Sequence, residues 1–185
     1  EYFQKCEPTT PPGACSYGQQ YQPHFSQSTP IRSSSQVQIY EELVQNAEHQ
    51  FTTSFTRRDF DVKDNRLLPK GWKERGPSDL RIPAPFLEAT LPKGSARRDP
   101  VYLGGNGQSV VRYEIPLPPG ASASNITTSV SLYSQATPPH FLADRYRTPG
   151  PATARLQHLN TAVGSLAGTN FENWKLLVAR SQPAN

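Results

Sequence analysis

The stretch QVQIYEELVQNAEHQFTTSFTRR, residues 36–58, decides the fold that the sequence predicts. Val37, Ile39 and Leu43 fall on odd positions, with polar residues between them. This period of two is typical of a strand with one buried face. The stretch Phe51–Phe55 alternates aromatic and hydroxyl side chains in the same way. The two arms, rich in Thr, Phe and Tyr, therefore predict a β-hairpin.

The polar segment between the arms predicts a short loop with residues 47–50 at its tip. A helix is the alternative, because Ile39, Leu43 and Ala47 also recur at helical spacing. The Thr and aromatic residues on both arms favour the hairpin over this helix.

Further segments with strand-like or helical periodicity follow along the chain. The strand-like ones are SVVRYEIPLP (109–118), NITTSVSLYSQ (125–135), NWKLLVARS (173–181), and the shorter 86–91 and 100–103. A turn-rich connection predicts that the first two are antiparallel neighbours. One helix is predicted within TPGPATARLQHLNTAVGSLAGTN (148–170), where leucines recur at helical spacing. Thr148 or Thr153 would cap its start and Gly168 would end it.

The predicted fold class is all-β, mainly an antiparallel β-sandwich of the Ig-like kind, with one short helix near the C-terminal end. The 19 prolines, about twice the usual share, favour short strands and ordered loops. Residues 1–35, rich in Ser, Gln, Pro and Thr, predict a long irregular segment, and residues 36–185 predict the sandwich domain. We expect aromatic packing, through residues such as Tyr2 and Phe25, or a disulfide to order the irregular segment.

Composition limits the classes of function. Leu, Ile, Val and Phe make up one fifth of the 185 residues, so the core is lean. The net charge of +4 hides a basic segment, residues 57–98, with eleven Lys or Arg against six Asp or Glu. Few aromatics interleave with these cations, so nucleic acid is not an expected partner. No apolar run reaches the roughly eighteen residues that predict a transmembrane segment.

The two cysteines, Cys6 and Cys15, lie in CEPTTPPGAC and would close a small Pro-rich loop. A disulfide between them would fit an oxidising compartment, although two free thiols would give the same sequence. The chain starts at Glu1 and contains no Met. We therefore expect either a removed leader or the downstream part of a longer product.

Motifs for catalysis or metal binding are missing from the sequence. The four histidines show no metal-ligand spacing, no Ser has a GxSxG setting, and no CxxCH provides covalent haem attachment. The glycine-rich residues 104–107 lack the Lys of a phosphate-binding loop. We therefore predict that the chain is not an enzyme and holds no cofactor or metal itself. His24, expected to be exposed in a tail, is a candidate contact to a partner or to a cofactor on a neighbouring module.

The stretch VKDNRLLPKGW (62–72) predicts a structural corner rather than a chemical site. Lys63 and Arg66 would pair with nearby carboxylates, and Asp64 or Asn65 would bond to local backbone groups as turn residues do. The Pro and Gly that follow force a change of direction. Three apolar residues would plug the corner against the core: Leu67, Leu68 and Trp72.

The order of several segments carries a resemblance. These are QVQIYEELV, FTTSFTRR, VKDNRLLPKGW, VVRYEIPLP, LYSQATPPHFLADRY and LNTAVGSLAGTNFENWKLLVA. Over residues 36–179 they resemble the non-haem C-terminal region of extracytoplasmic bacterial multihaem c-type cytochromes. The most specific pieces are KDNRLLPKGW, QATPPHFL and the ending LN…FENWKL. In that family the region looks like a β-rich module that follows a run of CxxCH motifs.

The resemblance implies a periplasmic or extracellular location, with haem c on a neighbouring region or partner. It implies a non-catalytic module or subunit of an exported electron-transfer assembly, serving docking, assembly or structural support. The chain departs from the family by lacking CxxCH, since Ser16 follows Cys15, so no residue here takes over a haem ligand. Alternatives are a structural subunit of an extracellular filament, or a secreted surface- or carbohydrate-binding module that uses Trp72, Tyr133 or Phe141. Homo- and hetero-oligomers are left open.

Overall fold

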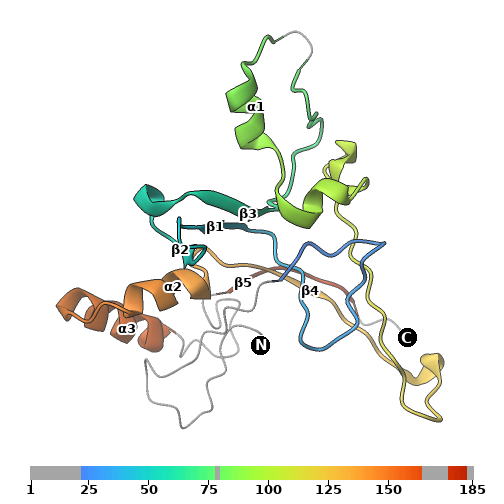
Figure 1. Cartoon of the computed structure of the whole chain (residues 1–185). Coiled ribbons are helices and arrows are strands. Elements are labelled where there is room, and N and C mark those ends of the chain that lie inside the picture. Colours follow the sequence, from blue (N-terminus) through green and yellow to red (C-terminus); the bar gives the residue numbers. More distant parts are fainter. Residues whose placement is uncertain (1–21, 78–79, 164–174, 183–185) are drawn as a thin grey trace. The chain divides into compact units, whose positions relative to one another are not determined.

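The computed structural model describes residues 22–77, 80–163 and 175–182. The chain divides into two compact units, which are treated separately below (Figure 1). The N-terminal unit is Gln20–Pro116, and the C-terminal unit contains Leu117–Asn185. Residues 22–35 belong to the same unit as residues 36–116. Cys6, Cys15 and the aromatic residues before residue 22 lie outside the described residues.

A three-stranded antiparallel sheet in the order β2–β1–β3 forms the centre of the N-terminal unit. Its strands are β1 (Glu42–Gln45), β2 (Phe51–Thr52) and β3 (Phe60–Asp64), and a 3₁₀ turn η1 (Phe55–Arg57) precedes β3. The β1–β2 pairing confirms the predicted hairpin, although β1 begins later than the periodicity indicates. The Asn46 side chain holds the loop, because its Oδ1 accepts the N–H groups of Glu48 and Gln50.

The segment 109–118 carries the clearest strand pattern, yet the prediction of a strand there is wrong. It makes one isolated parallel bridge, Ile31 to Tyr113. The Ile31 N–H donates to Arg112 O at 2.8 Å, and Glu114 N–H donates to Ile31 O at 2.8 Å. The chain bends at residues 27–29 and turns at residues 33–35, on either side of Ile31, so the pairing does not extend into a ladder.

The two shorter strand predictions are also wrong. Residues 86–91 lie mostly in helix α1 (Ala84–Thr90), which starts after Pro83 and has a Pro in its first turn. A Pro at this point, followed by Leu, Glu and Ala, is a helix-start signal that outweighs the apolar pattern. Residues 100–103 overlap the 3₁₀ turn η3 (Tyr102–Gly104), and another turn, η2 (Gly94–Arg98), precedes it.

The core of the N-terminal unit is small and partly polar. Its buried apolar side chains are Phe25, Ile31, Leu91, Ala96 and Tyr102. They share the interior with buried polar residues: Gln22, His24, Ser26, Asn46, Lys63, Asn65 and Asp99. Burying such groups is costly unless each finds a hydrogen-bond partner. The described residues include no buried side-chain nitrogen or oxygen without one.

The C-terminal unit contains a two-stranded antiparallel sheet, β4 (Ser131–Ser134) with β5 (Leu176–Arg180). These strands lie within two predicted segments, 125–135 and 173–181, although a 3₁₀ turn η4 (Ala123–Asn125) stands at the start of the first. The predicted helix is α3 (Pro151–Val163), and its predicted end at Gly168 lies outside the described residues. Helix α2 (Pro139–Tyr146) was not predicted, and Asn160 of α3 donates to its Tyr146 hydroxyl at 3.1 Å.

The described residues therefore form two small antiparallel sheets and a few short helices. The prediction of antiparallel strands is confirmed in this coarse form, whereas the Ig-like sandwich stays a prediction. The prediction of one short helix is wrong, because α1 and α2 form as well as α3. The missed helices start at a proline pair or at Pro-x-Pro, whereas the prolines of this chain predict short strands and ordered loops.

Two glycines of the N-terminal unit provide a matched test of backbone strain. Gly71 and Gly105 both have positive φ, and the Gly71 N–H donates to Gly105 O at 2.7 Å. A Cβ on Gly105 would lie 2.6 Å from Trp72 O, whereas one on Gly71 would meet nothing within 4 Å. We predict that Gly71→Ala costs about 1 kcal/mol of unfolding free energy. Gly105→Ala should cost more than about 2 kcal/mol, measured by urea unfolding. Equal costs would contradict the close contact.

Candidate functional site

The predicted corner lies at the end of β3, and its four polar residues alternate in burial. The Lys63 and Asn65 side chains are 0% exposed, Asp64 is half-buried and Arg66 is exposed. Adjacent residues of an extended chain point to opposite faces, so two face the interior and two face solvent. Trp72 follows in the next turn and is half-buried. The alternation of side chains along the strand thus places these four residues on two opposite faces, although they are consecutive in the sequence.

The Lys63 ammonium is fully enclosed and has two partners. It donates to Ile39 O at 2.9 Å and to Glu41 Oε1 at 3.0 Å. Burial lowers the pKa of Lys63 from its ordinary value of 10.5, and the Glu41 carboxylate acts in the opposite direction. A buried ammonium that loses its carboxylate is strongly destabilising, so this pair holds β3 to the segment before β1.

The Asn65 side chain joins three separate parts of the N-terminal unit. Its Oδ1 accepts the Glu41 N–H at 2.8 Å, and its Nδ2 donates to Ile39 O at 2.8 Å. The same Nδ2 group lies 3.1 Å from His24 Nδ1. The amide therefore uses both its acceptor and its two hydrogens inside the protein.

The surrounding donors fix the tautomer of His24. The Phe25 N–H donates to Gln38 Oε1 at 2.8 Å, so the Gln38 NH₂ group faces His24 Nδ1, 3.0 Å away. The Asn65 amide is oriented in the same way by the Glu41 N–H. Two N–H donors therefore point at Nδ1, which must carry a lone pair. The proton sits on Nε2 and is donated to Asp99 Oδ2 at 3.0 Å.

Asp99 closes this buried polar network, which we define as His24, Gln38, Asn65 and Asp99. Its Oδ1 accepts the N–H groups of Val101 and Tyr102, at 2.9 and 3.2 Å. The Tyr102 ring lies 4.9 Å from the His24 ring, and its hydroxyl donates to Arg66 O. Burial, with a contribution from Asp64, raises the pKa of Tyr102 well above its ordinary value. Tyr102 thus links the network to the corner.

The expectation of an exposed His24 is wrong. The residue is 2% exposed, and each of its ring nitrogens is occupied by hydrogen bonds within the network. A general base needs access to a substrate proton, and this imidazole has none. The expectation that Leu67 plugs the corner is also wrong, because that residue is 58% exposed. Its neighbour Leu68 is half-buried.

The solvent side of the corner carries the expected ion pairs. Arg66 contacts Asp64 at 2.6 Å and Glu42 at 3.8 Å, and Arg58 bridges Glu42 and Asp61. Exposed pairs of this kind contribute little to stability.

The sequence patterns do not predict the network members that are distant in sequence from the corner at residues 62–72. Gln38 was assigned only to the polar face of a strand, and Asp99 was not connected with His24. One signal was present: Asp99 precedes Pro100, and an Asp-Pro pair favours a turn in which the carboxylate accepts the following N–H groups. The pairing of His24 with Asn65 spans 41 residues and leaves no local pattern.

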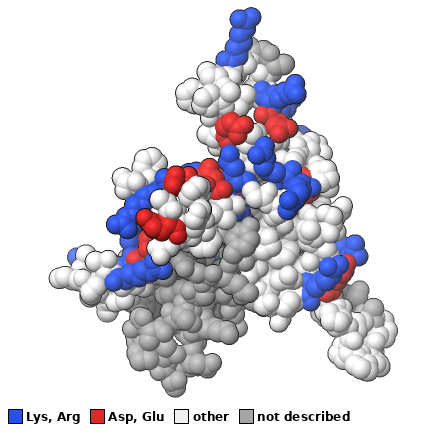
Figure 2. Space-filling model, viewed as in Figure 1, with Lys and Arg blue, Asp and Glu red and all other residues white. Residues whose placement is uncertain are grey.

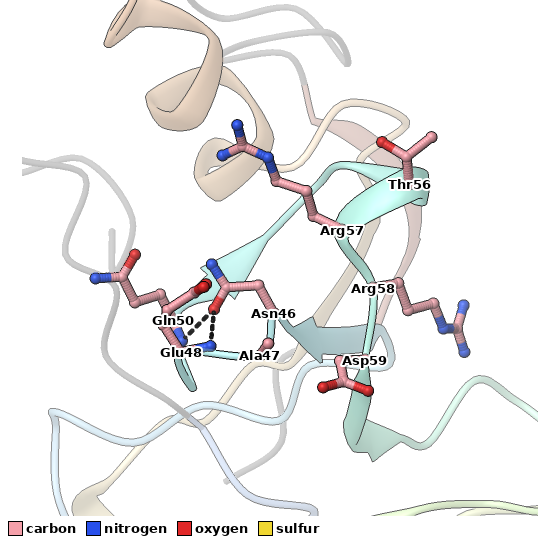
Figure 3. Close-up of a pocket in the computed structure, with 8 residues that line it drawn as sticks. All are labelled: Asn46, Ala47, Glu48, Gln50, Thr56, Arg57, Arg58 and Asp59. Atoms are coloured by element: carbon pink, nitrogen blue, oxygen red, sulfur yellow. Dashed lines mark hydrogen bonds between the residues drawn. The ribbon is translucent and has the colours of Figure 1, made fainter.

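An open hollow of about 650 Å³ lies beside the β1–β2 loop (Figure 3). It is lined by Asn46, Ala47, Glu48, Gln50, Thr56, Arg57, Arg58 and Asp59. Figure 3 shows the charged side chains pointing in different directions rather than toward one centre. The Arg58 guanidinium is also held by Asp61 at 2.6 Å. The hollow therefore lacks the converging polar groups of a ligand site.

Neither a metal cluster nor a membrane span is found in the described part of the chain. No three His, Cys, Asp or Glu side chains there could hold a metal ion together. No helix within residues 22–77, 80–163 and 175–182 has the length and apolar character to cross a bilayer.

Comparisons with protein families, curated proteins and solved structures find no match.

We predict that Asn65→Ala and Asp64→Ala differ in effect, although the residues are adjacent. Asn65→Ala leaves the buried Glu41 N–H without its acceptor and removes one of the two donors from Ile39 O and from His24 Nδ1, so it should cost about 2 kcal/mol of unfolding free energy. Asp64→Ala removes a pair with an exposed arginine and should cost about 1 kcal/mol or less. Chemical unfolding followed by circular dichroism would measure both. Equal losses of unfolding free energy in the two variants would show that the buried network contributes no more to stability than the exposed ion pair.

The lowered pKa of Lys63 predicts a pH dependence with a definite sign. Above its folded-state pKa the folded chain has released the proton, while the unfolded chain retains it up to pH 10.5. The contribution of Lys63 to unfolding free energy should therefore rise as pH rises through this window. Lys63→Met removes this titration, so the wild type should gain stability relative to the variant on going from neutral pH toward pH 10.5. Tyr102 titrates in both proteins and cancels in the difference. A constant difference would contradict the prediction.

Proposed function

We propose that the chain is a non-catalytic, β-rich module of an exported multihaem-cytochrome-type electron-transfer assembly, where it serves docking, assembly or structural support. Haem c is carried by a neighbouring region or partner in this proposal, and the location is the periplasm or the extracellular space. The Ig-like sandwich belongs to the same proposal. The sequence segments quoted above supply the biological context.

The burial of the residues that could act as acids or bases is the observation that supports a non-catalytic role. His24, Asp99 and Lys63 are all buried, and their polar atoms are occupied by backbone groups and by one another. A catalytic carboxylate or imidazole must reach the reacting atoms, directly or through one water. A closed network of this kind supports a role in holding the unit together.

Exposed apolar side chains support a role in association. In the C-terminal unit several lie on or beside the β4–β5 sheet: Val130, Leu132, Tyr133, Leu176 and Val178. Single exposed apolar residues are common on protein surfaces, but a group on one small sheet is typical of contact surfaces.

The carbohydrate-binding alternative has less support. Flat aromatic platforms need exposed rings, and of the three named rings Tyr133 alone is classed as exposed. The Lys175 ammonium lies 5.1 Å from the centre of that ring. Trp72 and Phe141 are half-buried, and the Arg145 guanidinium lies 4.7 Å from the Phe141 ring.

The proposal is tested by purifying the native chain together with its bound partners and recording absorption spectra. We expect a Soret band in the complex and none in the chain after separation, because the chain has no CxxCH. The recombinant chain, produced in a host that matures c-type cytochromes, serves as the control and should also lack the band. A native complex without any haem-bearing partner would contradict the proposal.

A further inference from the structure

Charge is divided unevenly over the N-terminal unit. Around the sheet, cations pair with carboxylates: Arg58 with Glu42 and Asp61, Arg66 with Asp64, and Lys63 with Glu41. Seven exposed cations of this unit have no acidic partner within the described residues, and one of them, Arg57, lies in η1 beside the sheet. The other six are Lys70, Lys73, Arg75, Arg81, Arg97 and Arg98. The basic character of the segment is therefore concentrated in a set that its own acids do not neutralise.

Backbone contacts tie loop 67–76, which carries three of these cations, to the segment that follows η2, and η2 itself carries two more. Loop 67–76 is tied to loop 102–107 by the Gly71–Gly105 hydrogen bond and by close approach of Gly107 to Lys70. The 3₁₀ turn η2, which ends in Arg97 and Arg98, packs on β3 through the Asp64–Lys93 bridge. Figure 2 shows Lys and Arg gathered where α1 and η2 lie, with some acidic side chains among them.

Large apolar side chains are exposed among these cations. Leu67, Leu80 and Phe86 are 58%, 56% and 67% exposed. Phe86 belongs to α1, which stands away from the three-stranded sheet of its own unit (Figure 1). Apolar residues exposed among mostly basic side chains, without a covering element of the same unit, are a feature of surfaces that bind another protein.

We propose that loop 67–76, α1 and η2 form a docking face for an acidic protein surface that also presents apolar side chains. The inference rests on the proposed docking role and adds the chemical class of the partner. Carboxylates on the partner would neutralise the six cations, while its apolar residues would cover Phe86 and Leu80. Exposed charges steer association and make it sensitive to salt, and the apolar contacts slow dissociation.

The composition of the docking face favours an acidic protein as its partner over nucleic acid or an anionic membrane. Binding of single-stranded nucleic acid uses several stacking rings, and Phe86 is the one ring classed as exposed on this face. An amphipathic helix that lies on a membrane needs a long apolar stripe, and α1 spans seven residues. Scattered Lys and Arg with a few apolar side chains match a carboxylate-bearing protein surface.

The test compares two double variants of the full chain with equal charge. Lys73→Gln with Arg75→Gln alters the face, and Arg57→Gln with Arg155→Gln removes two exposed cations elsewhere. The probe is a fluorescent Glu-rich peptide with interspersed Leu and Phe, titrated at low and at physiological salt. We expect the first variant to bind roughly fivefold more weakly than wild type, and the second to bind within twofold. Phe86→Ser should weaken binding with little change in salt dependence.

Melting curves of all variants should coincide, because the substituted side chains are exposed. Equal weakening in both double variants would reduce the effect to net charge and overturn the proposal. Tighter binding to duplex DNA or to vesicles of anionic phospholipid than to the acidic peptide would overturn it as well. If the face variants bind the acidic peptide as tightly as wild type while the native chain still purifies with a haem protein, the proposed docking role stands. The assignment of docking to this face is then wrong.

Discussion

The N-terminal unit depends on the requirement that every buried polar group has a partner. Its apolar interior is small, and Lys63, Asn65, His24 and Asp99 occupy space that aliphatic residues fill in most domains. Asn65 satisfies backbone groups on the segment before β1 and orients His24, which in turn binds Asp99. Such a network specifies one arrangement strongly, because any register shift leaves several buried donors without acceptors.

The same requirement limits the chemistry that the buried polar network can offer. An imidazole and a carboxylate 3.0 Å apart look like part of a catalytic relay, yet here each remaining polar atom is also occupied. The backbone N–H groups of Val101 and Tyr102 donate to Asp99 Oδ1. The amides of Gln38 and Asn65 fix the orientation of the His24 ring. The solvent side of the same strand, by contrast, carries ion pairs that are weak and exchangeable. Contacts of this corner with a partner would therefore involve its solvent side rather than the buried network.

Local patterns in the sequence predicted some elements and not others, for identifiable reasons. The hairpin and α3 follow from periodicity over continuous residues, so both are found. Segment 109–118 alternates well but has Ile31, next to Pro30, as its bridging partner, and a strand needs a partner as much as a pattern. Helices α1 and α2 begin at prolines, which as a residue type favour loops and short strands when composition alone is considered. The Lys63 and Asn65 positions could be singled out, but His24 and Asp99 meet them only through long-range folding.

Loop 67–76 illustrates how a backbone detail affects association. Gly105 allows the chain to approach Trp72 O closely, and the Gly71 N–H fastens the loop to its neighbour. A flexible loop with several long cationic side chains would lose conformational entropy when a partner orders it. Because this backbone is already fixed in the free protein, binding has to immobilise the side chains alone. A smaller part of the interaction free energy is then lost to ordering, and a modest contact area suffices for a specific complex.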